Sequence, residues 1–301
     1  MSLDALAAAI RNRRVILFVG GGITQNLGLP DLSVLVRYIR ERMGLDSGNY
    51  HLRDYPILAE AYVLGEGKIG TLRSWMDVTW HPKTVDVTRS EVHNLILDLD
   101  FPVIYTTNYD HWLEAAYTAR GKPFHKVTSV GDLTRSDGQT TEIIKFHGDF
   151  DDDDSIVLTE TSYFQRMSFE TPLDLRLRSD SLARPLLFLG YSLHDVNTRY
   201  LLYKLQQLWD NSAWSEQRPT SYILMTEGSL ARETVLRHRG IEPLVVEAAD
   251  PGTATVKFLR NLRDRVRRPA SSREAGQSRS QGSTKKQTRS TAVKRKLGKH
   301  A

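Results

Sequence analysis

Short apolar runs alternate with longer amphipathic stretches along most of this chain. Each of these runs is only a few residues long and is bounded by polar residues or glycine: 15–19, 103–106, 143–146, 185–189, 222–225 and 244–246. Such runs are typical of strands that are covered on both faces. Strands separated by helices favour a parallel sheet with right-handed crossovers. The pattern therefore predicts an α/β fold, in which ligands bind beyond the carboxyl ends of the strands.

Between these runs, apolar residues recur at three- and four-residue spacing, which is the period of a helix. This spacing predicts helices that begin near Asp31, His111, Thr159 and Asp195. Residues 45–100 have helical spacing throughout and no clear strand, so we expect a helical insertion or lid between the first two strands. Its Trp75, Trp80 and His81 either line a pocket or simply pack the core of the insertion.

Composition narrows the class of protein. The 301 residues suffice for one large domain or two small ones, and 40% of them are hydrophobic. The chain has no cysteine, which excludes disulfides, thiolate metal sites and a cysteine nucleophile and fits a reducing cytoplasm. No apolar run approaches the roughly 18 residues of a membrane span, and residues 1–10 lack the pattern of a secretory signal.

The net charge of +5 conceals an uneven distribution. Residues 257–301 carry a net charge of +13, so the preceding residues carry −8. We expect residues 1–267 to form the folded domain and residues 268–301 to form a disordered basic tail, because so few apolar residues cannot offset the entropy of ordering. The tail either neutralises nucleic-acid phosphates or serves as a solubilising segment, and it has no aromatic residue for base stacking.

The first motif with candidate chemistry follows the first strand. Gly20-Gly21-Gly22 removes side chains where the backbone approaches a ligand, and its amides with the hydroxyl of Thr24 can surround a diphosphate. No Gly-Lys-Ser/Thr follows, so it is not a Walker loop, and its spacing is not G-x-G-x-x-G.

Three further motifs also follow predicted strands. Asn108 and Asp110 come after the second strand, and each either contacts a ligand or caps the next helix. His147 comes after the third and is either catalytic or structural. Gly190 and Ser192 form another strand-end turn with a hydroxyl. The acidic run 151–154 predicts a solvated turn rather than a metal site.

The ordered set of motifs resembles the sirtuin superfamily, in its bacterial sirtuin-like branch of NAD hydrolases from anti-phage defence. The matching segments in chain order are Gly20-Gly21-Gly22-Ile23-Thr24, Gly28-Leu29-Pro30-Asp31, Thr106-Thr107-Asn108-Tyr109-Asp110, His147-Gly148 and Gly190-Tyr191-Ser192-Leu193. The resemblance covers about residues 11–250 and implies a Rossmann-like parallel sheet with helices on both faces, without a zinc module.

The resemblance also implies an NAD site, with NAD as the substrate and no metal. Gly20, Gly21, Gly22, Ile23, Thr24 and Ser192 would hold the phosphates and the adjacent ribose. Asn108 and Asp110 would face the nicotinamide ribose and carboxamide, and His147 would be the general base. The remaining implied contacts are Asp31, Thr107 and Gly190.

Two departures from the protein-deacylating sirtuins bear on the reaction. Those enzymes carry four zinc-binding cysteines, and they carry Phe-Arg where this chain has Leu32-Ser33. Both differences favour cleavage of NAD to nicotinamide and ADP-ribose by Asn108 and His147. A zinc-free NAD-dependent deacylase and an NAD-sensing regulatory module are the alternatives. The resemblance further implies control by self-assembly into a homo-oligomer or by a separate partner, such as a motor ATPase or an Argonaute.

Overall fold

The structure is a computed structural model that describes residues 3–45, 50–191, 196–210 and 212–268. The chain divides into two units, Met1–Val266 and Arg267–Ala301. The second unit lies almost wholly outside the described residues, and so does the predicted basic tail. All the strands and nearly all the helical residues described below belong to the first unit.

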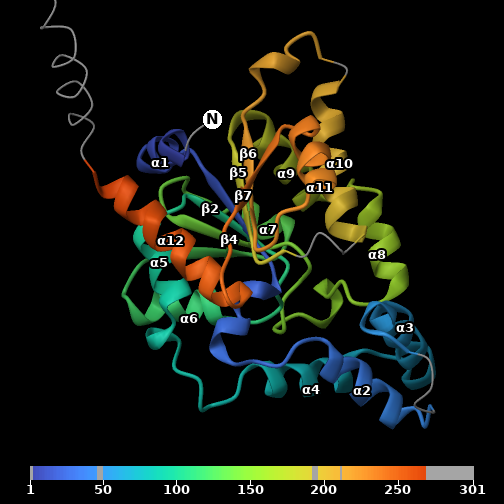
Figure 1. Ribbon diagram of the computed structural model, residues 1–301. Coiled ribbons are helices and arrows are strands. Elements are labelled where there is room, and N and C mark those ends of the chain that lie inside the picture. The colour runs from blue at the N-terminus through green and yellow to red at the C-terminus, as the bar shows by residue number, and fades with distance from the viewer. Residues whose placement is uncertain (1–2, 46–49, 192–195, 211, 269–301) are drawn as a thin grey trace, which may run out of the picture. The chain divides into compact units, whose positions relative to one another are not determined.

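Seven parallel strands form one sheet in the described part of the chain (Figure 1). The strands are β1 (Ile16–Val19), β2 (Val103–Thr106), β3 (Phe124–Val127), β4 (Thr141–Lys145), β5 (Leu186–Leu189), β6 (Ser221–Met225) and β7 (Ile241–Val245). Their spatial order is β3-β4-β2-β1-β5-β6-β7. The chain therefore places β2, β3 and β4 on one side of β1, with β4 between β2 and the edge strand β3, and then builds the other side outward from β5 to β7. The reversal of direction lies between β1 and β5.

Helices cover both faces of this sheet (Figure 1). The α-helices are α1 (Leu3–Arg11), α2 (Ser33–Arg42), α3 (Tyr55–Glu66), α4 (Gly70–Trp80), α5 (Glu91–Leu99), α6 (Trp112–Ala119), α7 (Val130–Leu133), α8 (Glu160–Met167), α9 (Pro172–Ala183), α10 (Val196–Asp210), α11 (Leu230–His238) and α12 (Pro251–Arg267). None of these described helices is long and apolar enough to cross a membrane.

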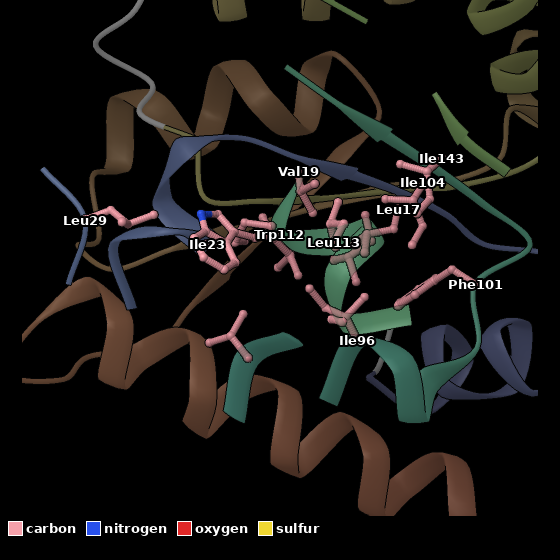
Figure 2. Close-up of a cluster of buried hydrophobic side chains, with 14 of the residues drawn as sticks. Leu17, Val19, Ile23, Leu29, Ile96, Phe101, Ile104, Trp112, Leu113 and Ile143 are labelled. Atoms are coloured by element: carbon pink, nitrogen blue, oxygen red, sulfur yellow. The ribbon is translucent and has the colours of Figure 1, made fainter. Parts of the chain in front are cut away.

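The two faces of the sheet enclose separate apolar cores, because successive side chains of a strand point to opposite faces. In β1, Leu17 and Val19 join the larger core with residues of α1–α6 and α12, whereas Ile16 and Phe18 join the smaller core with residues of α9–α11. Figure 2 shows Leu17, Ile104 and Ile143, from three neighbouring strands, gathered in the larger core. The predicted α/β class with helices on both faces is confirmed.

The sequence pattern missed one strand and misplaced at least one end of every strand that it predicted except β2, with the largest offsets in β4 and β7. The edge strand β3 carries half-buried His125 and Lys126, so it lacks the continuous apolar signal of the central strands. β4 ends at Lys145, one residue before the predicted end. β7 begins at Ile241, well before the predicted start at Leu244, and its partly buried alternation fits an edge strand.

The described residues between β1 and β2 form helices joined by turns and loops, with no strand. α2 starts where the amide of Ser33 donates to Asp31 Oδ1 at 2.8 Å, close to the predicted cap. α3 and α4 follow, and α5 packs its apolar face on the sheet through Val92, Leu95 and Ile96, each at most 2% exposed.

Candidate active site at the strand ends

The four sequence motifs follow four strands that are adjacent in the sheet. His147 follows β4, Asn108 follows β2, the Gly20 turn follows β1, and Gly190 follows β5, in the spatial order β4-β2-β1-β5. All four strands are parallel, so the motifs share the carboxyl edge on which such sheets bind ligands. Ser192 lies outside the described residues.

The glycines after β1 pack against the turn after β5. A Cβ on Gly22 would lie 2.6 Å from Gly190 Cα, and one on Gly20 would lie 2.9 Å from Gly190 O. Gly190 itself has a φ of +71°, which side-chain-bearing residues rarely adopt. By contrast, a Cβ on Gly21 would meet nothing within 4 Å. Gly20, Gly22 and Gly190 are therefore required for packing, whereas Gly21 faces open space.

Most polar groups of this turn are already used within the protein. The amide of Gly22 donates to Gly190 O at 3.0 Å, that of Ile23 to Gly20 O at 3.2 Å and that of Thr24 to Gly21 O at 3.2 Å. The Thr24 hydroxyl also donates to Gly21 O, at 2.9 Å. The Ile23 side chain is fully buried in the larger core. The turn therefore offers fewer free amides to a diphosphate than the sequence suggested. A phosphate contact at Gly21 stays a prediction.

Tyr191 links the ends of β1, β2 and β5. Its hydroxyl donates to Val19 O at 3.0 Å and lies 3.0 Å from Thr107 Oγ1, which is therefore the donor in that second bond. Its ring packs against Gly20, where an added Cβ would meet ring carbons at 3.1 Å. The predicted NAD contact Thr107 thus has its hydroxyl engaged by Tyr191, a residue that motif matching does not single out.

The Asn108 loop carries an unsatisfied donor. Its backbone amide donates to Thr106 Oγ1 at 3.0 Å, but its side-chain Nδ2 is buried and has no hydrogen-bond partner among the described residues. Buried polar groups without partners are rare, and at a strand-end site they point to a ligand or a water. Asn108 therefore fits a role in contact with substrate.

Asp110 lies two residues before α6 and accepts a hydrogen bond from its first residue, close to the capping role that was the structural alternative. Its Oδ1 accepts the amide of Trp112 at 3.3 Å, and the residue is only 8% exposed. Burial raises the pKa of its carboxyl, despite the nearby Lys145. A contact between Asp110 and the nicotinamide end of NAD stays a prediction.

His147 is held by its backbone and is neutral at physiological pH. Its carbonyl accepts the amide of Val157 at 2.8 Å. The next residue, Gly148, has a φ of +96°, and a Cβ there would lie 2.2 Å from Ser155 O, so the turn requires glycine. Burial, with the charge of Arg166, lowers the pKa of His147 to about 3. The imidazole is therefore in the form that accepts a proton.

Tyrosines form a wall beside this imidazole. The Tyr163 ring stands edge-on to His147 at a centroid distance of 5.6 Å, and its hydroxyl lies 2.5 Å from that of Tyr55. Tyr109, next to Asn108, donates its hydroxyl to Val157 O at 2.7 Å. Burial raises the pKa of both Tyr109 and Tyr163, so both stay protonated. The Tyr163 ring that packs against His147 is therefore uncharged.

A cluster of charged groups surrounds Asp149, two residues after His147. Asp149 is fully buried and contacts His111 Nε2 at 2.7 Å and Lys126 Nζ at 3.3 Å. Lys126 also contacts Asp151 Oδ2 at 2.6 Å. The ligand atoms of His111, Asp149 and Asp151 lie within 4.8 Å of one another, but the Lys126 ammonium already bridges the two carboxylates. The acidic run is thus partly ion-paired, and not simply solvated as expected.

The end of the helical insertion braces two of the motif loops. Trp80 Nε1 donates to Pro30 O at 2.9 Å, and Trp112 Nε1 donates to Trp80 O at 2.9 Å. The amide of His111 donates to His81 Nε2 at 2.8 Å, so the remaining ring proton is on Nδ1, which lies 2.5 Å from Asp77. Trp80 is buried at 9% exposure. Trp80 and His81 therefore pack and brace, the plainer of the two roles considered from the sequence.

Comparison with known proteins shows which known domain this arrangement resembles. Residues 102–244 match the model of the SIR2-like domain. This segment of the chain is therefore similar to a SIR2-like domain. The matched segment begins just before β2 and ends within β7, so it includes the Asn108, His147 and Gly190 motifs but not the glycine turn after β1.

Curated relatives of the SIR2-like chain bear names from defence and NAD hydrolysis. It is 26% identical over 257 residues to defense-associated sirtuin 2 of Bacillus subtilis, which covers 82% of this chain and 24% of the relative. It is 28% identical over 202 residues to the NAD(+) hydrolase ThsA of Enterococcus faecium, covering 66% of this chain and 41% of the relative. The ThsA of Acinetobacter baumannii is 25% identical over 208 residues, with coverages of 68% and 42%.

The SIR2-like chain thus spans between about a quarter and two fifths of the length of these relatives. A solved structure described as "Structural Basis for the Mechanism and Regulation of Sir2 Enzymes" aligns over 88% of this chain and 100% of its own, with a TM-score of 0.44 and 10% identity.

Proposed function

We propose that this SIR2-like chain hydrolyses NAD at the bond between nicotinamide and ribose, giving nicotinamide and ADP-ribose, and that it depletes cytoplasmic NAD during defence against phage. The names of the ThsA relatives and of the defence-associated sirtuin support this proposal. The observation that carries it is the unpaired, buried amide of Asn108 at the end of β2, beside the strand that delivers neutral His147.

The reaction needs little from the protein beyond position and a base. Nicotinamide leaves as a neutral molecule when the bond to ribose C1′ breaks, with the electron pair going to the ring nitrogen. A water forms the new bond at C1′ and loses a proton, and the transition state resembles an oxocarbenium ion. Asn108 Nδ2 can donate to the oxygen of that water or of a ribose hydroxyl, and His147 can take the proton.

The surroundings of His147 favour this division of work. Its lowered pKa keeps the imidazole neutral, which makes it a weak but always available base. The Tyr163 ring beside it is protonated and brings no charge to the imidazole. Gly21, exposed and free of close neighbours, is the part of the glycine turn that a phosphate can approach.

Product analysis of purified protein incubated with NAD tests the proposal. We expect nicotinamide and ADP-ribose without any acyl peptide, and a fall in rate of about 10²–10⁴-fold in Asn108→Ala and His147→Ala. Asn94→Ala on α5 and His125→Ala on β3 are matched controls, because the described hydrogen bonds of these side chains go to the backbone carbonyls of Thr88 and Asp132, away from the motif loops. NAD loss that requires an acyl-lysine peptide would instead support a deacylase, and binding without turnover would support an NAD sensor.

We also propose that assembly or a partner protein restrains the activity, because unregulated NAD loss is toxic to a cell. Apolar side chains stand exposed on the helical insertion and the adjoining α8, with Ile57, Leu64 and Phe164 at 47%, 77% and 61% exposure. Contiguous exposed apolar residues often mark protein interfaces. A specific activity that rises with protein concentration would support self-assembly as the gate, and a constant specific activity would contradict it.

A further inference from the structure

Lys145 is a fully buried charge at the point where two motif loops meet. It is the last residue of β4, two residues before His147, and its side chain has 0% exposure. The strand is otherwise apolar at this end, with Ile143 and Ile144 also at 0% exposure. A buried ammonium costs several kcal/mol unless it is well paired, so its partners indicate why the fold tolerates it.

The partners of Lys145 belong to the Asn108 loop and its support. Nζ donates to the carbonyl oxygen of Asp110 and to that of Tyr109 at 3.3 Å. It also lies 3.2 Å from Glu114 Oε1 and 3.3 Å from Asp149 Oδ2. The ammonium thereby ties the backbone just after Asn108 to the strand that leads to His147.

The Asn108 side chain depends on this backbone for its orientation. Its Nδ2 has no hydrogen-bond partner among the described residues, so no side-chain bond to that nitrogen fixes the amide. The backbone on its amino side is held by the bond to Thr106 Oγ1. The carbonyls on its carboxyl side are held by Lys145. The lysine is thus one anchor of this end of the loop, together with the Phe150 amide, which donates to Tyr109 O at 3.4 Å, and His81, which accepts the amide of His111.

We propose that Lys145 is a positioning residue that sets the Asn108 amide relative to His147, and that it acts without touching the substrate. The side chain is completely buried and its ammonium is surrounded by protein oxygens, so it has no access to NAD. Lys145 is not the only cation beside Asp149, because Lys126 and His111 contact the other oxygen, Oδ1, of that carboxylate. The contacts specific to Lys145 are those to Glu114 and to the two loop carbonyls.

Lys126 provides a matched control for this inference. Lys126→Met, like Lys145→Met, removes one positive charge and one ion pair with Asp149. None of the described contacts of Lys126 is with the carbonyls of Tyr109 or Asp110. Lys145→Met leaves Glu114 without its cation and can unfold the protein, so Lys145→Met/Glu114→Gln removes one charge of each sign and keeps the cluster's net charge.

The experiment measures steady-state NAD cleavage and amide hydrogen exchange in wild type, Lys126→Met, Lys145→Met and the double variant. We expect kcat to fall about 100-fold in the Lys145 variants, with KM changed less than about threefold, because misplacement of a catalytic group affects the chemical step. Exchange in residues 106–112 should become faster in these variants, with residues 20–24 unchanged. Lys126→Met should match wild type in kcat and in exchange of both segments.

The two readouts separate this inference from the proposed function on which its kinetic part rests. If wild-type protein does not cleave NAD, the proposed function fails, and exchange in residues 106–112 alone decides the role of Lys145. Exchange and kcat in the folded double variant that equal those of Lys126→Met would overturn the inference. Equal losses in the Lys126 and Lys145 variants would also overturn it, because they would show a general effect of the charged cluster.

Discussion

Substitution by alanine should destabilise the protein at Gly22 but not at Gly21, its neighbour in the turn after β1. In Gly22→Ala, the new Cβ would lie 2.6 Å from Gly190 Cα and 2.9 Å from Gly190 O. These are backbone atoms of another strand end, which cannot move aside as a flexible side chain would. In Gly21→Ala, the new Cβ would meet nothing within 4 Å. Neither glycine has a positive φ, so backbone strain does not separate the two variants.

The steric difference sets the expected magnitude. Forcing one methyl group into a tightly packed site costs about 1–3 kcal/mol. For a domain of this size, each kcal/mol lowers Tm by roughly 2–4 °C, so Gly22→Ala should lose between about 2 and 12 °C. Gly21→Ala should stay within about 0.5 kcal/mol of wild type or gain slightly, since alanine restricts the unfolded chain.

Thermal unfolding followed by circular dichroism measures the first difference, and steady-state kinetics measures a second. If Gly21 is where a phosphate of NAD approaches the backbone, Gly21→Ala should raise KM for NAD while leaving Tm unchanged. Equal Tm values for the two variants would refute the packing argument. A Gly21→Ala enzyme with wild-type KM would remove the phosphate contact from this residue.

Two further predictions concern the base and the brace. Because the pKa of His147 is lowered to about 3, its neutral form persists as pH falls, and kcat/KM for NAD should stay flat between pH 7.5 and pH 5 while circular dichroism shows a folded protein. A decline with a midpoint near 6.5 would contradict this environment for the imidazole. Trp80→Phe removes the bond to Pro30 O and should cost about 1 kcal/mol in the free energy of unfolding plus lost packing. Trp75→Phe, whose ring stacks on Tyr38 without a described hydrogen bond, is the control, and an equal loss in both variants would argue against the brace.

The central strands were predictable because their burial leaves a direct trace in the sequence. β1, β2 and β5 are buried at every position, so they read as continuous apolar runs. The edge strand β3 is only half-buried at Phe124, His125 and Lys126, and its Phe-His-Lys-Val sequence contains no continuous apolar run. Its place beside β4 is decided by hydrogen bonds to a strand that comes later in the chain.

The sequence predicted that the site residues follow strands, but not which hydrogen bonds and packing contacts they make. Motif order and strand pattern together placed Asn108 and His147 at strand ends, and the structure shows that these two strands are neighbours. They did not distinguish Gly21, which faces open space, from Gly22, which packs against Gly190. A lysine inside an apolar strand was the one sequence signal of the buried cluster, and only its partners across three segments give that lysine a role.

The sequence by itself determined the class of fold, the family resemblance and the absence of cysteine chemistry, because these depend on residue type and local spacing. The tertiary structure decided which polar groups are already paired and which are left for a ligand. That decision rests on atoms brought together from distant parts of the chain: Gly190 against Gly22, Val157 against His147, and Lys145 against the carbonyls after Asn108. Local spacing carries no information about such contacts, since they form only when the strands pair.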